Sequence, residues 1–331
     1  MKQFSIYKPK TVEEALAALS SGEKAAAIYA GGTDLLIRLK NRLYTSPDVL
    51  VDIKGLEDLR FVRYDETGGL VIGSLVTLGE LAEAKEAVYY PVIAQTISSI
   101  SSPELRNQST VGGNILQEVW CPYYRSDYRC WRNGGDICYA EVGDNTEYQS
   151  IMGAKKSFAA YPGDLAITLA ALDAKVTVAG PEGRRQLTIE ELIPGEVEAE
   201  GKIQSHVLRR NELLAEISIP PPGNDELYLF GKVRKREVWD FASASAAMRL
   251  SLDNKTIRRA SVFFGGIATR PWRDRRLEDY LSGKELRYDL PDSAIQEVLV
   301  DARPLPHNGY KKDQAVGLLN SMLADAVSRV K

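Results

Sequence analysis

The sequence lacks the features that would direct it to membranes, nucleic acids or the outside of the cell. No apolar run approaches the roughly 20 residues of a membrane helix, and the first residues carry no apolar signal-peptide core. The net charge of −3 provides no broad cationic field for phosphodiester backbones or anionic lipids. We therefore expect a cytoplasmic protein with no membrane span and no nucleic-acid partner.

Cysteine and histidine are also scarce. The three cysteines all lie between Cys121 and Cys138, where an odd number does not suit a disulfide framework but does suit an intracellular metal site. The two histidines, His206 and His307, lie far along the chain, so a zinc site would need three thiolates and one other ligand. No Ser-His-Asp set, no recognisable pair of carboxylates and no HExxH motif is present. A hydrolase is therefore not supported.

What the sequence does contain predicts a globular protein. Its 331 residues, 44% of them hydrophobic, predict two or three compact units. Thr11 followed by Glu14 is typical of a capping box at the start of a helix. The expected elements of residues 1–55 are a helix over 11–19, a strand over 25–29, a helix over 35–39 and a strand over 49–53. They form a small βαβ-like unit.

The rest of the chain predicts a larger mixed unit over 56–220 and a C-terminal unit over 223–331, divided at Pro220-Pro221-Pro222-Gly223. The larger unit has expected strands over 70–74, 175–178 and 213–219 and helices over 77–84, 91–100 and 165–172, with a polar linker before the last strand. The C-terminal unit has expected strands over 228–233, 242–252 and 258–265 and helices over 293–302 and 314–327. The fold class is α+β.

The stretch from 120 to 148 has no sustained period and is rich in Tyr, Arg, Gly, Asp and Cys. An irregular segment of this length inside a compact domain is typical of a functional loop or of disorder, and the aromatic content argues against disorder.

Two glycine turns are the main binding candidates. Ala30-Gly31-Gly32-Thr33-Asp34 follows a strand and opens a helix, where backbone amides can hold a pyrophosphate. Ser109-Thr110-Val111-Gly112-Gly113-Asn114 offers a hydroxyl, bare amides and a carboxamide. Neither has the spacing of the Rossmann fingerprint or the P-loop. Taken alone, the first can be a structural turn and the second a tight corner between helix and strand.

The order of these motifs resembles the FAD-binding subunits of the molybdenum hydroxylases, the family of xanthine dehydrogenase and carbon monoxide dehydrogenase. The residues that carry the resemblance are 28–35, 110–114 and Asp164, and, beyond the prolines, 213–220, Phe230-Gly231-Lys232 and Phe264-Gly265-Gly266. The resemblance therefore covers nearly the whole chain. It implies a two-subdomain FAD-binding fold followed by a C-terminal antiparallel sheet with helices.

The resemblance also assigns residues to FAD. Those expected to hold its phosphates and ribityl chain are Ile28, Tyr29, Ala30, Gly31, Gly32, Thr33, Asp34, Leu35, Thr110, Val111, Gly112, Gly113 and Asn114. Ile100 and Leu214 match positions that pack on the cofactor, while Asp164 and Lys232 match positions that bond to it. A cation near the flavin pyrimidine edge stabilises the anionic reduced ring. Without the resemblance, Lys232 would be read as a solvated lysine on a strand.

An insertion over 117–161 carries all three cysteines and resembles one member of the family, the flavin subunit of 4-hydroxybenzoyl-CoA reductase, which holds an extra [4Fe–4S] cluster on such a loop. The resemblance implies that Cys121, Cys130 and Cys138 bind a cluster. Thiolates are the ligands that iron–sulfur clusters favour, although the spacing is not that of a ferredoxin. Zinc and three incidental cysteines are the alternatives.

A fourth cysteine is expected after Gly153-Ala154, where this chain has Lys155-Lys156-Ser157-Phe158. The alternatives are a non-cysteine ligand, an open iron, a three-iron cluster or no cluster. The candidates for a non-cysteine ligand are Asp136, Asp144 and Ser157.

No molybdopterin domain and no plant-ferredoxin cysteine pattern occurs in the chain. The resemblance therefore implies two partners, a large molybdopterin-binding subunit and a small [2Fe–2S] subunit, with this chain as the electron-transfer subunit between them and an external carrier. The cysteine loop favours inward flow, in which electrons enter from a ferredoxin through the cluster; the alternative, without a cluster, is outward flow to NAD or another acceptor. A stand-alone flavin oxidoreductase and a cofactor-free scaffold of the same fold are the competing hypotheses.

Overall fold

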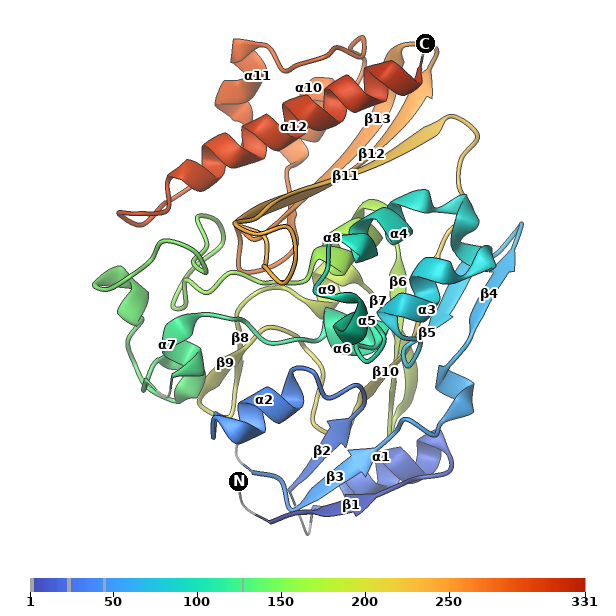
Figure 1. Ribbon diagram of the computed structural model, residues 1–331, viewed down its shortest axis with the longest axis vertical. Helices are drawn as coiled ribbons and strands as arrows, with labels where there is room; N and C mark the ends of the chain where they lie inside the picture. Colours follow the sequence, from blue (N-terminus) through green and yellow to red (C-terminus); the bar gives the residue numbers. More distant parts are fainter. Residues whose placement is uncertain (1–2, 23–24, 44–45, 127, 331) are drawn as a thin grey trace.

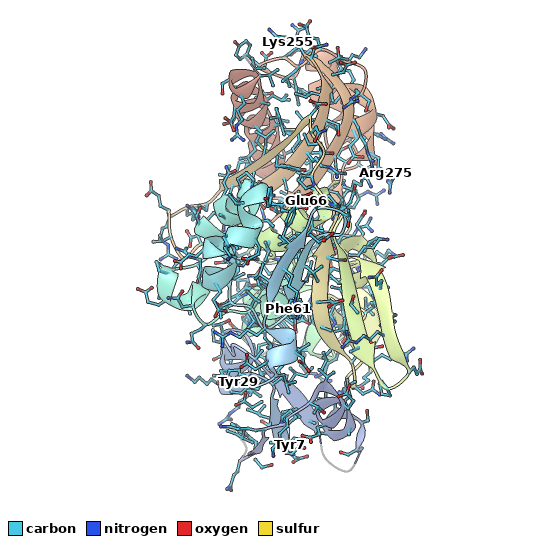
Figure 2. All side chains as sticks on the ribbon, turned by 90° about the vertical axis from the view of Figure 1, so that its right-hand side faces the viewer. Tyr7, Tyr29, Phe61, Glu66, Lys255 and Arg275 are labelled. Carbon is cyan, nitrogen blue, oxygen red and sulfur yellow. The ribbon has the colours of Figure 1, made fainter. Side chains whose placement is uncertain are left out.

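Three sheets follow one another along the long axis of the molecule in the computed structural model, which describes residues 3–22, 25–43, 46–126 and 128–330 (Figure 1). Figure 2 shows the same order from the side, with Tyr7 and Tyr29 at one end, Phe61 in the middle and Lys255 at the other end. Among the described helices, none combines the length and apolar character needed to cross a membrane.

The N-terminal sheet is parallel, with strand order β1-β3-β2. Its elements are β1 (Ser5–Tyr7), α1 (Val12–Ser20), β2 (Ala26–Tyr29), α2 (Leu35–Lys40) and β3 (Val49–Asp52). Thr11 caps α1 by accepting from the amide of Glu14. The Glu14 carboxylate, however, accepts from the amide of Lys10 at 2.7 Å, so the capping-box prediction is correct in only one of its two bonds.

The middle sheet is antiparallel, with strand order β4-β5-β10-β6-β7. Its strands are β4 (Val62–Asp65), β5 (Gly69–Gly73), β6 (Lys175–Gly180), β7 (Gly183–Thr188) and β10 (Leu213–Ile219). Its helices are α3 (Leu78–Glu83), α4 (Pro91–Ser98), α5 (Pro103–Arg106), α6 (Val111–Ile115), α8 (Asp164–Ala171) and α9 (Ile189–Leu192). Every residue of α8 is buried, because this helix lies between the middle unit and the C-terminal sheet.

The C-terminal sheet is antiparallel, with strand order β11-β12-β13-β14. Its elements are β11 (Glu226–Val233), β12 (Ala244–Asp253), β13 (Thr256–Gly265), β14 (Trp272–Arg273), α10 (Arg275–Leu281), α11 (Asp292–Glu297) and α12 (Tyr310–Arg329). One face, with Ala247 and Phe263, joins the core around α8; the other, with Met248 and Phe264, packs on α10 and α12. Both faces are therefore buried over much of β12 and over the second half of β13.

Three sequence predictions need correction. The polar linker before β10 contains β7, α9 and the hairpin of β8 (Val197–Ala199) and β9 (Lys202–Gln204). These strands were missed because β7 is largely exposed and carries little apolar pattern. The helix expected over 293–302 ends at Glu297, and α12 begins earlier than predicted, at Tyr310.

The stretch from 120 to 148 is irregular, as predicted. In its described part it contains only short helical turns, namely α7 (Pro122–Arg125), η3 (Trp131–Asn133) and η4 (Tyr139–Glu141).

Candidate functional site

The two glycine turns lie directly against each other. A Cβ atom on Gly31 would stand 2.0 Å from the carbonyl oxygen of Gln108, so only glycine allows this approach. Thr33 Oγ1 and Ser109 Oγ are 3.1 Å apart and share a hydrogen bond. Gly32 has φ +73°, a left-handed conformation that glycine adopts at little cost. Segments 76 residues apart in the chain thus form one structure.

The first turn leaves its backbone amides open. Within the described residues, the amides of 31–35 donate to no protein acceptor, although Leu36 already donates to the carbonyl of Gly32 at 3.0 Å. The turn leads from the end of β2 into α2, so these amides lie at the positive end of the short helix. Open amides in this position suit an anionic group such as a phosphate.

The second turn is the start of a helix rather than a corner between a helix and a strand. Thr110 caps α6 by accepting from the amide of Gly113 at 3.1 Å. The amides of Val111 and Gly112 donate to the carbonyls of Val76 and Ser74 at 2.8 and 2.9 Å. These two amides are therefore bound within the protein and are not free for a ligand. The glycine at 112 is needed for close packing, because a Cβ there would stand 2.9 Å from the Cβ of Ser74.

A cavity of about 890 Å³ opens along both turns, within the range of roughly 300–1,000 Å³ for small-molecule sites. The predicted residues that line it are Ile28, Ala30, Gly31, Gly32, Thr33, Asp34, Leu35, Thr110, Gly112, Gly113 and Leu214. Open amides beside a cavity of this size suit a dinucleotide whose phosphates would lie at the first turn. The predicted residues that do not line the cavity are Tyr29, Ile100, Val111, Asn114, Asp164 and Lys232.

Asp164 and Lys232 bind each other. Lys232 Nζ lies 2.6 Å from Asp164 Oδ2, and each side chain is only 4% exposed. Ser245 donates to the other carboxylate oxygen at 2.8 Å, and Lys232 also donates to the carbonyl of Ser99 at 3.1 Å. The pair connects α8 with β11, so Lys232 is not a solvated strand lysine; its contact with FAD stays a prediction.

Asp34, at the end of the first turn, connects this turn to the cysteine-bearing loop. Its carboxylate pairs with Arg125 at 2.8 Å and with Arg38 at 3.2 Å. It also accepts from the amide of Glu118 at 3.2 Å. Sequence reasoning missed this bracing, because no periodicity distinguishes a buried arginine in an irregular loop from an exposed one.

Further residues at the cavity were not predicted from the sequence. Among those that line it are Glu118, Tyr124, Arg132 and His206. Burial lowers the pKa of His206, which keeps its imidazole neutral beside the cavity, and burial raises the pKa of Tyr124. The clustering of arginines with aromatic residues between 120 and 132 is the signal that could have indicated them.

Cys121, Cys130 and Cys138 are free and buried in the loop. Burial raises the pKa of the Cys121 and Cys138 thiols, and the neighbouring cysteines raise it further. Gln149 Nε2 donates to Cys121 Sγ at 3.7 Å. In the part of the chain that the structure describes, however, no three side chains of His, Cys, Asp or Glu form a group able to hold a metal ion.

The candidate fourth ligands are also committed elsewhere or exposed. Ser157 Oγ accepts from Arg132 Nε at 3.0 Å, so this hydroxyl is already bound to a guanidinium. Asp144 accepts from the amide and hydroxyl of Thr146, and Asp136 is exposed. The predicted [4Fe–4S] cluster on Cys121, Cys130 and Cys138 is therefore not supported by the described residues, which offer no ready fourth ligand.

Comparison with known proteins supports the sequence resemblance. Residues 2–222 match a family described as the FAD binding domain in molybdopterin dehydrogenase, and residues 230–326 match the CO dehydrogenase flavoprotein C-terminal domain. The chain is 33% identical to the aldehyde oxidoreductase FAD-binding subunit of Escherichia coli, over 98% of this chain and 99% of that protein. It is 25% identical to the nicotinate dehydrogenase FAD-subunit of Eubacterium barkeri, over 100% and 98% respectively.

The fold agrees with this match. A solved structure of carbon monoxide dehydrogenase from Hydrogenophaga pseudoflava superposes with a TM-score of 0.76 at 22% identity, covering 99% of this chain and 98% of that one. The shared fold includes both the glycine-turn region and the C-terminal sheet, and it confirms the predicted α+β architecture. With two matched domains and a relative that aligns over nearly its whole length, this chain belongs to the family of FAD-binding subunits of molybdenum hydroxylases.

Proposed function

We propose that this chain is the FAD-binding electron-transfer subunit of a multi-subunit molybdenum hydroxylase, working with a large molybdopterin-binding subunit and a small [2Fe–2S] subunit. One observation carries the proposal: two glycine turns meet at the wall of a cavity of about 890 Å³, in a chain that matches the family from residue 2 to 326. The substrate of the complex would bind on another chain, and a cytoplasmic location stays a prediction.

The residues of this chain would hold FAD in two ways. The open amides of 31–35 would bind the phosphates, because they are aligned donors at a helix start. The apolar side chains of Ile28, Leu35 and Leu214 would exclude water from the rest of the cofactor. When bound, FAD supplies the step between one-electron carriers and two-electron chemistry. No side chain of this chain needs to act as an acid or base.

The direction of electron flow that we favour is outward, from the partner subunits through FAD to NAD or another acceptor. This direction requires no metal centre on the chain itself. It is supported by the contact between Arg132 and Ser157, which occupies one of the three candidate fourth ligands, and by the lack of a metal-binding group among the described residues.

A second candidate is inward flow from a ferredoxin through a [4Fe–4S] cluster, as in 4-hydroxybenzoyl-CoA reductase. It is supported by three thiols buried in one loop, where Cys130 contributes to raising the pKa of Cys121 and of Cys138. An aromatic CoA thioester would then be the substrate of the complex. If Ser157 were the fourth ligand, binding of iron would have to break the hydrogen bond between Arg132 and Ser157.

Anaerobic purification with the neighbouring subunits tests both candidates. FAD, iron and acid-labile sulfide would be determined on the isolated chain, and molybdenum and [2Fe–2S] proteins in the co-purified material. Stoichiometric FAD without iron on this chain supports the outward relay; about four iron and four sulfide per chain would establish the inward one. A chain that binds no FAD, or that purifies without molybdenum and [2Fe–2S] partners, would refute the proposal.

A further inference from the structure

Arg132 is a buried cation that connects distant parts of the inserted loop. Its side chain is 1% exposed and lies 3.3 Å from the carboxylate of Glu118, at the start of the insertion. It donates to Ser157 Oγ at 3.0 Å, near the end of the insertion, and to Ser205 Oγ at 3.1 Å, beyond β9. One guanidinium thus joins both ends of the loop to the body of the protein.

The segment around Ser157 is held by protein atoms throughout. The carboxylate of Glu196 accepts from the amides of Lys155, Lys156 and Ser157 at 2.7 to 3.1 Å. The ammonium of Lys156 also lies 4.7 Å from the ring centre of Trp131. A carboxylate bound to three successive amides is a strong, charge-assisted arrangement. This end of the loop therefore needs no metal ion to be ordered.

The start of α12 holds the opposite side of the loop. Lys311 Nζ donates to the carbonyl of Glu147 at 2.6 Å and to that of Gly266 at 2.7 Å, so it joins the loop to the C-terminal sheet. The hydroxyl of Tyr310 donates to the carbonyl of Thr146 at 2.8 Å. Figure 1 shows the loop beside the first turn of α12, as these bonds require.

The loop fixed in this way forms part of the cavity that takes FAD. Glu118, Tyr124 and Arg132 line the cavity, and all three come from the insertion. The same segment braces the first glycine turn, because Asp34 accepts from the Glu118 amide and pairs with Arg125. A shift of this segment would move the turn whose amides face the cofactor.

We propose that Arg132 is a positioning residue for FAD: by joining Glu118, Ser157 and Ser205 it holds the inserted loop as a wall of the cofactor cavity, and it does so without a metal ion in the loop. The inference rests on FAD binding by this chain and shares with the outward relay the lack of a metal centre in the loop. It predicts that cofactor affinity depends on the guanidinium of Arg132 and not on the three thiols.

The experiment compares FAD binding by variants of the full-length apoprotein, measured by quenching of flavin fluorescence. Arg132→Met should weaken FAD binding by roughly tenfold or more, because it leaves the carboxylate of Glu118 buried without its cation. Arg132→Lys keeps the positive charge but loses the planar guanidinium with its several N–H donors. Its FAD affinity should therefore lie between those of R132M and wild type. Visible-region circular dichroism of FAD at saturation should change in R132M, because the cofactor would sit in an altered wall.

Two controls make the result decisive. Arg129→Met removes an exposed arginine of the same loop and should leave FAD affinity within about twofold of wild type, since exposed substitutions have small effects. The triple variant Cys121→Ala, Cys130→Ala and Cys138→Ala should bind FAD as R129M does, and wild-type protein purified anaerobically should hold far less than one iron per chain.

Wild-type affinity in R132M, or loss of FAD in the cysteine variant, would overturn the proposal. If R132M does not fold, R132K replaces it as the test variant. FAD affinity and circular dichroism equal to those of wild type in R132K would then overturn the proposal. Failure of wild-type protein to bind FAD would instead refute the proposed function.

Discussion

The two glycine turns look alike in the sequence and differ in the structure. Both place paired glycines at the start of a short helix. In the described structure the first leaves the amides of 31–35 open, whereas the second donates those of Val111 and Gly112 to protein carbonyls. The difference teaches that a glycine pair in the sequence predicts a close contact made by the backbone. It does not predict whether the contacting group is a ligand or another segment of the protein. Under the proposed function the first turn would face FAD, and the second lies against the first.

Gly31→Ala should give the largest effect, since it breaks the contact between the turns. The added Cβ would meet the Gln108 carbonyl oxygen at 2.0 Å, and neither backbone can move without opening the pair. We expect FAD affinity to fall roughly 100-fold, equivalent to about 2.7 kcal/mol. Fluorescence titration measures it. Gly55→Ala is the matched control, because a Cβ there meets nothing within 4 Å. Equal affinity in the two variants would show that the turns need not touch.

Asp34→Asn tests how far the first turn depends on the cysteine-bearing loop. It removes the charge that faces Arg38 and Arg125, and the Arg125 side chain is only 8% exposed. We expect a loss of about 2 kcal/mol in the free energy of unfolding and about tenfold weaker FAD binding. Asp52→Asn is the control: its partner Lys54 is 43% exposed, so the loss should be below about 1 kcal/mol. Similar losses in both would mean that the loop does not brace the turn.

Lys311 provides a pH test of the same loop. Burial lowers its pKa from 10.5 to about 7, and no carboxylate among the described residues is paired with it. The unfolded chain regains the ordinary value, so between pH 7 and 10.5 it binds more protons than the native chain. Stability should therefore rise with pH in this window, by at most about 1.4 kcal/mol per pH unit. The carboxylate of Glu147 pairs with Lys235, and the hydroxyl of the neighbouring Tyr310 donates to the carbonyl of Thr146.

Denaturant unfolding at pH 7, 8 and 9 measures the slope. Lys311→Met should flatten it, and Lys312→Met, one residue further along α12, should retain it. A slope that is the same in wild type and K311M would assign the pH dependence to other groups.

Thr110→Val should give the smallest effect and sharpens the comparison most directly. It removes the cap of α6 and should cost about 1 kcal/mol of stability, as Thr11→Val should at the cap of α1. FAD affinity should stay within about threefold of wild type, because the second turn contributes shape and not open donors. Thermal unfolding and titration of both variants test this. A loss of affinity comparable with that of G31A would show that both turns bind the cofactor.

Much of the fold could be predicted from the sequence where local patterns are strong. The capped helices α1 and α3, the strands β2, β3 and β10, and the α+β class follow from periodicity, caps and glycine or proline punctuation. The hairpin of β8 and β9 could not be predicted, since short polar strands carry no period and are defined by their partner.

The candidate site, too, was predicted from the sequence only in part. Residue types alone indicated the two glycine turns, and most of the residues assigned to them line the cavity. The cysteine pattern indicated a metal site, but the described residues contain no group able to hold a metal ion, because spacing in an irregular loop says nothing about which side chains converge. Asp164 and Lys232 were each expected to bond to FAD; in the structure they pair with each other and do not line the cavity, so their contact with FAD stays a prediction.

By itself the sequence determined the family, the α+β class and the positions where the backbone must approach closely, because those depend on local conformation and on the absence of a side chain. The tertiary structure alone decided which amides stay open, which charges are paired and what holds the inserted loop. These depend on contacts between segments far apart in the chain, such as Arg132 with Ser157 and Ser205 or Lys311 with Glu147, and no local pattern encodes the distance between them.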